Sequence, residues 1–290
     1  MTWLLVCHDA GGSEVVSSWA AHHPEHRYLA LAEGPAAKVF ARKLPAPSVS
    51  REQAFGSLEV TRVLTGSSWG SDLEKLAVRH FRARGVPVAT FLDSWMNYPA
   101  RFALADEVRL PDEVWVGDEH AEAIARRELA GATVRRMTNH YLADIAAEIR
   151  GLSAQAGPGD RVLYVSEPTS AAAVRGTGDP RALGYTEFEA LEGFLRWVAG
   201  QRAAVRLRLH PAEPAHKYDE LLRRHDGLSV EVSAGRTLAE DCGWATRVVG
   251  CDSMVMAMCV LAGKPVLCAI PTGGRALTLP FPEIVRLFPA

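Results

Sequence analysis

The sequence has few cysteines, no excess of either charge and no Cys-x-x-Cys pair. Its 290 residues include 5 cysteines, and an odd number without close pairs indicates neither a disulfide framework nor a zinc site. We predict instead that the cysteines are buried as small apolar side chains. The 32 lysines and arginines against 34 acidic residues give a formal net charge of −2. This balance argues against binding to nucleic acid, which needs an excess of cations to neutralise phosphates.

Long apolar segments and an export signal are missing as well. The longest apolar runs, Trp3–Cys7 and Met254–Ala262, are too short to span a bilayer. The first residues lack the basic region of a signal peptide, and the apolar stretch that follows them stops at His8. We therefore expect a cytoplasmic protein with no transmembrane segment. Hydrophobic residues make up 48% and charged residues 23%, as in an ordinary globular protein.

Short apolar runs alternate with helical stretches along the whole chain, which is typical of parallel sheets covered by helices on both faces. Strands are predicted at 3–7, 28–31, 60–64, 86–92, 113–116, 133–136, 161–165, 205–209, 228–232, 247–249 and 265–270. Helices are predicted at 13–22, 36–42, 71–84, 119–129, 144–150, 188–199, 215–224, 238–244 and 253–262. The segment Gly151–Asp160, rich in Gly, Ser, Ala and Pro, is predicted to link two domains, 1–150 and 151–290. The expected fold class is therefore α/β, with two Rossmann-like domains whose parallel sheets face a central cleft.

Ligands of open α/β sheets bind beyond the carboxyl ends of the strands, so the residues that follow each strand are the candidates. The turn His8–Gly12 follows the first strand. Its glycines allow a ligand to approach the N–H groups of the next helix, and Asp9, with His8 beside it, is the candidate catalytic residue, acting as a general base. The alternative is a plain turn in which Asp9 binds local backbone. The Gly-x-Gly-x-x-Gly signature of dinucleotide-binding folds is absent here.

Two more segments of the first half have side chains suited to a sugar. Thr65–Ser71 combines glycines and hydroxyls before a helix that a capping box of Ser71 and Glu74 is predicted to open. It lacks the Gly-Lys-Ser/Thr of a P-loop, and a purely structural turn is the alternative. Leu92–Tyr98 offers an acid, aromatic faces and an amide, or else is a loop that covers the core. The predicted acceptor-binding residues are Gly11, Gly12, Ser68, Asp93, Trp95 and Tyr98.

In the second half, a predicted strand ends at His210, where Pro211 prevents it from continuing. A histidine in that place can donate to a phosphate oxygen or act as an acid or a base. Gly250–Ser253 opens the helix 254–262, with Asp252 or Ser253 as N-cap, and a helix N-terminus attracts phosphate. An ordinary capped helix is the structural alternative. The predicted donor-binding residues are His210, Pro211, Ser166, Glu167, Asp252 and Ser253.

This arrangement resembles the GT-B superfamily of sugar-nucleotide enzymes. The second half is most similar, through the strand that ends in His210 and Pro211 and the helix that runs from Gly250–Ser253 to Gly263–Val266. The His-Pro pair is similar to that of bacterial sialyl- and polysialyltransferases and of the capsule and glycerophosphate transferases, in which it contacts the donor's phosphate. The acidic motif of the sialyltransferases is absent, and His8–Gly12 is an approximate substitute. The resemblance implies a nucleotide sugar as co-substrate and no essential metal or other cofactor.

Three functions remain open at this point. The first is a metal-independent glycosyltransferase, with the nucleotide sugar on the second domain and the acceptor on the first, where Asp9 deprotonates its hydroxyl. Asp93 and Glu119 are the other acids near strand ends of that domain that could serve as the base. The second is a nucleotide-sugar hydrolase or epimerase on the same fold. The third is a two-lobed protein that binds a small ligand without turnover.

Overall fold

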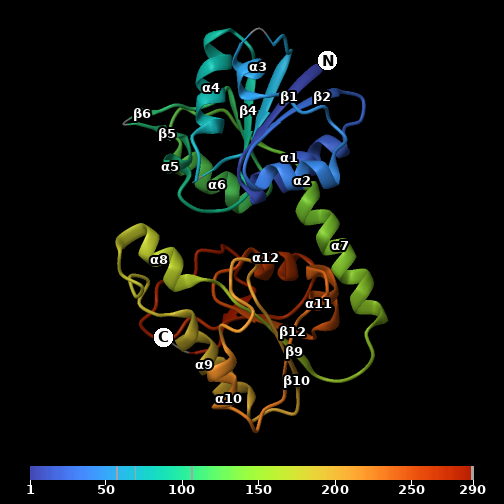
Figure 1. Cartoon of the computed structure of the whole chain (residues 1–290), viewed down its shortest axis with the longest axis vertical. Coiled ribbons are helices and arrows are strands. Elements are labelled where there is room, and N and C mark those ends of the chain that lie inside the picture. Colours follow the sequence, from blue (N-terminus) through green and yellow to red (C-terminus); the bar gives the residue numbers. More distant parts are fainter. Residues whose placement is uncertain (57, 69, 106, 289–290) are drawn as a thin grey trace. The chain divides into compact units, whose positions relative to one another are not determined.

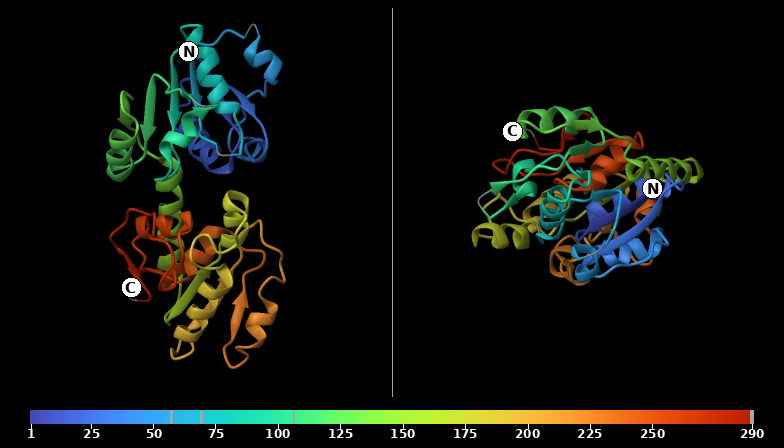
Figure 2. Two further views of the ribbon diagram at one scale, coloured as in Figure 1. Left: turned by 90° about the vertical axis from the view of Figure 1, so that its left-hand side faces the viewer. Right: turned by 90° about the horizontal axis from the view of Figure 1, so that it is seen from above.

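We describe the protein from a computed structural model, which places residues 1–56, 58–68, 70–105 and 107–288. The chain divides into two compact units, Met1–Ala143 (unit 1) and Asp144–Ala290 (unit 2). Helix α7 (His140–Gln155) runs across this boundary without interruption (Figures 1 and 2). In the part of the chain that the structure describes, no helix is both long and apolar enough to cross a membrane.

Unit 1 is built on a six-stranded parallel sheet with the order β2-β1-β3-β4-β7-β8. The strands are β1 (Thr2–Cys7), β2 (Arg27–Ala32), β3 (Arg62–Thr65), β4 (Val88–Phe91), β7 (Glu113–Val116) and β8 (Val134–Arg136). The helices are α1 (Ala10–Ala21), α2 (Pro35–Lys43), α3 (Arg51–Phe55), α4 (Leu73–Ala83), α5 (Tyr98–Phe102) and α6 (Glu119–Glu128). A short antiparallel pair, β5 (Ala103–Leu104) and β6 (Glu107–Val108), lies outside this sheet.

Both faces of this sheet are buried, which explains why its strands are apolar without alternation. Along β1, Trp3, Leu5 and Cys7 pack with residues of α1 and α2 on one face. Leu4 and Val6 point to the other face and pack with residues of α3 and α4. Successive side chains of a strand point to opposite faces, so one strand contributes to both cores.

Unit 2 repeats this architecture with the strand order β11-β10-β9-β12-β13-β14, again all parallel. Its strands are β9 (Arg161–Val165), β10 (Ala204–Arg208), β11 (Val230–Val232), β12 (Arg247–Gly250), β13 (Val266–Cys268) and β14 (Ile284–Arg286). Its further helices are α8 (Thr169–Thr177), α9 (Glu187–Val198), α10 (Asp219–Arg223), α11 (Leu238–Trp244) and α12 (Met254–Leu261). Val205 and Leu207 of β10 pack with α9, whereas Arg206 between them points to the other face and donates to Asp241 of α11 over 3.0 Å.

The strand orders define where each sheet can bind a ligand. In unit 1 the chain adds β2 on one side of β1 and then β3 on the other side. In unit 2 it adds β10 on one side of β9 and later β12 on the other. Loops that leave such a pair of strands diverge to opposite faces and open a crevice at the carboxyl edge, which is the usual binding place of the fold. The crevices belong to the β1/β3 and β9/β12 pairs.

The predicted strands are confirmed to within a few residues, but the sequence analysis does not include β5, β6, β14, α3 or α5. Three predicted bounds are wrong, and a further helix was missed. Helix α1 already begins at Ala10, because Asp9 in extended conformation ends the strand and lets the glycines enter the first turn. The predicted linker 151–160 is helical as far as Gln155, where its Ala and Leu residues continue α7 before Pro158 stops it. Helix α10 is shorter than the predicted 215–224, and α8 was not predicted.

The cysteines are buried, as the sequence analysis predicts. All five are free and buried. Cys7 lies in unit 1, and Cys242, Cys251, Cys259 and Cys268 lie in unit 2. Burial raises the pKa of Cys7, Cys251 and Cys268, and a hydrogen bond with Cys259, followed by burial, raises that of Cys242. This is the behaviour of small core side chains rather than of reactive thiols.

Candidate functional site

The β9/β12 crevice of unit 2 is organised by two acids, Glu167 and Asp252. The backbone N–H of Asp252 donates to Glu167 Oε2 over 2.7 Å, which ties the loop after β12 to the loop after β9. Burial raises the pKa of Glu167 to about 7, and the nearby charge of Asp252 acts in the same direction. A carboxyl group in this range can hold or release a proton at neutral pH.

The Asp252 carboxylate binds the segment that follows β13. It accepts from the Thr278 hydroxyl over 2.8 Å and pairs with the Arg275 guanidinium, also at 2.8 Å. Asp252 is therefore not the N-cap of α12. Ser253 takes that role, because its Oγ accepts from the Val255 N–H. The remaining N–H groups of the first turn of α12 lie beside these two acids.

His210 stands at the end of β10, next to this crevice in the sheet order. The Ala212 N–H donates to its Nδ1 over 3.1 Å, so Nδ1 carries no proton and the neutral ring is protonated at Nε2. Partial burial lowers the pKa of His210, which favours this neutral ring. His210 is exposed and keeps Nε2–H as a hydrogen-bond donor. Pro211 follows at the turn and is exposed as well.

The loop that presents His210 is held by Glu213, a residue that the sequence analysis did not select. Glu213 Oε2 accepts from the His210 N–H over 2.9 Å and from the Ser166 hydroxyl. Its Oε1 accepts from Lys217 over 2.8 Å and from the Tyr218 hydroxyl over 2.7 Å. These bonds outweigh the effect of burial and lower the pKa of Glu213. Ser166 is thus buried and engaged in holding the loop.

In unit 1, the β1/β3 crevice contains the pair His8 and Asp9. His8 Nδ1 and Asp9 Oδ1 are 2.8 Å apart, and because a carboxylate only accepts, Nδ1–H is the donor. Nε2 of His8 is then the ring's acceptor, and it lies against Gly34, where an added Cβ would be 2.7 Å away. An acid that fixes the tautomer of a histidine is a recurring arrangement for a general base.

A buried acid lies behind this pair. Glu74 of α4 is 3% exposed, and its Oε1 accepts from the His8 N–H over 2.8 Å. The predicted capping box is therefore wrong, because the Glu74 side chain binds β1's loop instead of its own helix end. Burial raises the pKa of Glu74 to about 7, and Asp9 contributes in the same direction. Its Oε2 is buried without a hydrogen-bond partner in the part of the chain that the structure describes.

Gly12 lets the backbone of α1 pass directly over the loop after β3. A Cβ at Gly12 would lie 3.1 Å from Ser67 N and 3.2 Å from Gly66 Cα. Such distances to backbone atoms leave no room for a side chain. Gly11, by contrast, faces Asp93, whose Oδ2 would be 2.1 Å from an added Cβ. The residues predicted from the ends of β1, β3 and β4 are therefore neighbours.

The segment after β4 has a structural task. Asp93 pairs with the buried Arg101 over 2.7 Å, and Arg101 also donates to Ser67 and Ser94. Tyr98 is fully buried and donates its hydroxyl to the Ser94 carbonyl. This position does not support the sugar-binding role predicted for Tyr98.

Two other predicted acceptor-binding residues are also mostly buried. Trp95 is 7% exposed and donates to Asp118, and Ser68 is 2% exposed and accepts from the Gly70 N–H. Asp93 remains the candidate residue of this segment, because it borders the start of α1.

The structure thus collects the predicted residues into two sets, one at the carboxyl edge of each sheet. The side chains that hold these loops and that sequence reasoning missed are Glu74, Glu213, Arg275 and Thr278. Only Glu213 had a local signal, its place three residues after His210. No group of three or more His, Cys, Asp or Glu side chains that could hold a metal ion occurs among the described residues.

No protein-family model and no curated protein matches the sequence. Among solved structures, the chain is similar to a UDP-GlcNAc 2-epimerase from Neisseria meningitidis bound to UDP-GlcNAc, with a TM-score of 0.63 and 10% identity over 92% of this chain and 82% of that one. It is similar to the UDP-GlcNAc 2-epimerase from Methanocaldococcus jannaschii, with a TM-score of 0.58 and 11% identity over 92% and 83%. It is also similar to the wall teichoic acid polymerase TagF soaked with CDPG, with a TM-score of 0.52 and 12% identity over 92% and 69%.

At these identities the similarity establishes the fold. The protein is an α/β protein of two domains, each with a parallel six-stranded sheet, and it has the GT-B-like fold. This fold is shared by UDP-GlcNAc 2-epimerases and by the transferase TagF.

Proposed function

We propose that the protein is an enzyme that uses a nucleotide sugar, and that unit 2 binds the diphosphate. The observation that carries this proposal is the fixed tautomer of His210. Its Nε2–H is a preset donor at a strand end, and the first turn of α12 offers further donors in the same sheet edge. Donors that are aligned before binding stabilise phosphate charge without the cost of reorganisation.

Within this class we favour epimerisation or hydrolysis of the nucleotide sugar over transfer to an acceptor. Two of the structures reported above are UDP-GlcNAc 2-epimerases. Epimerisation at carbon removes a proton from one face and returns one to the other, which requires groups that exchange protons near neutral pH. Glu74 and Glu167, whose pKa values burial raises to about 7, meet this requirement.

Glycosyl transfer is the second candidate, and a specific observation supports it. The His210-Pro211 pair resembles that of bacterial transferases, and the similar TagF structure is a polymerase. In that case Asp9, or the His8 that it orients, would deprotonate the acceptor hydroxyl. Because Trp95 and Tyr98 are buried, the acceptor would be bound by Asp93, Gly11 and Gly12.

The three reactions are distinguished by incubation with UDP-GlcNAc in D₂O without an acceptor. An epimerase places deuterium at the inverted carbon, a hydrolase releases UDP, and a transferase leaves the donor intact until an acceptor is added. A thermal-shift series with UDP, CMP, CDP, GDP and dTDP identifies the nucleotide, because a ligand at a hundred times its dissociation constant stabilises the fold by about 2.7 kcal/mol. If none of these nucleotides or their sugars binds, the proposed function is wrong.

A further inference from the structure

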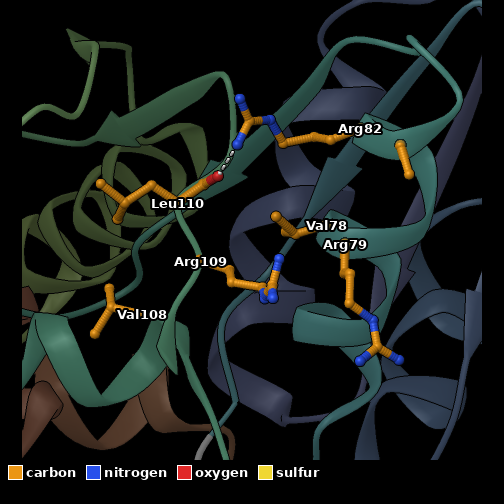
Figure 3. A pocket seen from close by; sticks show the side chains of 7 residues that line it. Val78, Arg79, Arg82, Val108, Arg109 and Leu110 are labelled. Carbon is orange, nitrogen blue, oxygen red and sulfur yellow. Dashed lines mark hydrogen bonds between the residues drawn. The ribbon is translucent and has the colours of Figure 1, made fainter. Parts of the chain in front are cut away.

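A pocket of about 490 Å³ lies in unit 1 between α4 and the segment that joins β6 to β7 (Figure 3). Its volume lies in the range of roughly 300–1,000 Å³ that is typical of small-molecule sites. Three arginines line it, Arg79 and Arg82 from α4 and Arg109 from the joining segment. The rest of the lining is apolar, mainly Val78, Val108 and Leu110.

The three guanidinium groups differ in how many hydrogen bonds and ion pairs they make within the protein. Arg82 is fixed by Asp112 at 2.9 Å and by the Leu110 carbonyl at 2.8 Å, as Figure 3 shows for the latter. Arg109 extends from the opposite wall toward α4 and pairs with Glu107. Arg79 has no hydrogen bond or ion pair with any residue that the structure describes. Among the described residues, three arginines therefore have two carboxylate partners, Asp112 and Glu107, and Arg79 is the arginine left without one.

Arg79 also borders a second pocket, of about 420 Å³, with His80 and Arg84. Burial and the charge of Arg84 lower the pKa of His80, so this histidine adds no further charge at neutral pH. The Arg84 guanidinium donates to the Gly56 carbonyl and faces the His80 ring, without a carboxylate partner among the described residues. The positive charge therefore continues along α4 past Arg79.

The pocket is separate from the candidate site of unit 1. Helix α4 leaves the carboxyl edge of the sheet near Glu74 and runs back to the amino edge, where Asp112 accepts from the Val88 N–H at the start of β4. Arg79 and Arg82 lie in the second half of α4, at this amino edge. A ligand here would not occupy the place of a sugar beside Asp9.

We propose that this pocket binds a small molecule in which a phosphate or carboxylate group is attached to an apolar body. The anionic group would take Arg79, whose planar fork matches two oxygens of a phosphate or carboxylate. The apolar body would cover Leu110 and Val108, a valine that is 55% exposed in the structure. This site lies outside the proposed reaction and does not depend on it.

Phenyl phosphate, inorganic phosphate and benzyl alcohol are suitable probes, because they separate the charge from the apolar surface. The titrations use the full chain with His210→Ala, which weakens the proposed phosphate site of unit 2, and each Arg79 variant is compared with its parent in this same background. We expect phenyl phosphate to bind more tightly than either of the other probes. Arg79→Ala should weaken its binding at least tenfold, and Arg79→Lys less, because an ammonium keeps the charge but not the fork.

Arg127→Ala is the matched control, since Arg127 is an exposed arginine of α6 that pairs with Glu128 outside the pocket. It should leave binding unchanged, and added salt should weaken binding to the wild-type pocket. Two results would overturn the proposal, because each would mean that binding is only non-specific charge attraction. One is equal affinity for phenyl phosphate and inorganic phosphate. The other is an equal loss of affinity for phenyl phosphate in Arg79→Ala and Arg127→Ala. Because nucleotide binding to unit 2 is measured separately, this outcome leaves the proposed function untouched.

Discussion

Glu167 accepts the backbone N–H of Asp252 over 2.7 Å, so the acid after β9 determines where the loop after β12 lies. Unit 1 contains the counterpart of this bond, because Glu74 accepts the His8 N–H over 2.8 Å. In both crevices a buried carboxyl group binds the backbone of the loop that presents the candidate residues. Burial raises the pKa of each carboxyl to about 7. The position of these loops is therefore coupled to proton binding near neutral pH.

This coupling predicts a pH-dependent stability that Glu74→Gln removes. The folded pKa of Glu74, about 7, lies above its usual value of 4.5, so its contribution is fully present below pH 4.5 and is lost as the pH rises through 7. The difference amounts to something on the order of 3 kcal/mol. Urea unfolding from pH 5 to pH 8 should show a smaller fall in the free energy of unfolding for Glu74→Gln than for wild type. The exposed Glu59→Gln should behave as wild type, and parallel curves for all three proteins would contradict the prediction.

His210→Ala should weaken nucleotide binding by about 1–3 kcal/mol, because a hydrogen bond from Nε2–H to phosphate is lost. His210→Gln should lose less, since its amide nitrogen can supply a donor near the position of Nε2. Calorimetric titration with the nucleotide found by thermal shift measures both. His216→Ala removes an exposed histidine that pairs with Asp219 and serves as the control. Unchanged affinity in a folded His210→Ala protein would remove His210 from the site.

Glu213→Gln should destabilise unit 2 by about 3 kcal/mol, because it breaks a buried pair with Lys217 and places an amide donor against other donors. The pKa of Glu213 lies below its usual value of 4.5, so its contribution is present above pH 4.5 and is lost as the pH falls through the folded pKa. The difference in the free energy of unfolding between Glu213→Gln and wild type should therefore become smaller as the pH falls. Glu220→Gln, an exposed change on α10, should show no gap at any pH. A gap that stays constant down to strong acid would speak against an ionised Glu213.

Asp9→Asn should lower turnover about 10²–10⁴-fold while nucleotide affinity stays close to that of wild type. The reason is that Asp9 belongs to unit 1, whereas the predicted phosphate donors belong to unit 2. His8→Gln distinguishes the two possible bases: activity survives if Asp9 takes the proton itself and disappears if His8 does. Asp72→Asn, on an exposed residue paired with Lys75, is the control. Near-normal turnover of Asp9→Asn would redirect attention to Asp93 and Glu119.

Two glycine-to-alanine substitutions should change the stability of the protein in opposite directions. Gly12→Ala forces its Cβ to within 3.1 Å of Ser67 N, and backbone atoms cannot move aside as a side chain can, so we expect a loss of about 1–3 kcal/mol. Gly151 lies inside α7 with nothing within 4 Å of an added Cβ, so Gly151→Ala should stabilise by about 0.5–1 kcal/mol. Thermal unfolding of both variants checks the pair. A stabilised Gly12→Ala would mean that α1 can shift away from the β3 loop.

The sequence predicts the sheets well because strands buried on both faces are continuous apolar runs, and β9 and α11 have the predicted bounds. It fails where long-range contacts decide. Helix α8 has a weak pattern of small residues, and its start is held by Glu187, which accepts from the Ser170 N–H. Glu74 looked like half of a local capping box, but its partner is 66 residues away. His210 could be predicted from its place at a strand end. The role of Glu213, which positions His210, could not, because it follows from bonds to Ser166, Lys217 and Tyr218. Ser166 comes close to Glu213 only when the sheet is folded.

The burial of all five cysteines makes the chain its own reporter of opening. A thiol-alkylating reagent can reach such side chains only when the surrounding structure separates, so the rate of labelling counts opening events. Cys7 records unit 1, and the other four record unit 2. Mass spectrometry of peptides labelled over time would then show, without any engineered probe, whether the two units open cooperatively, at equal labelling rates, or independently, at different rates.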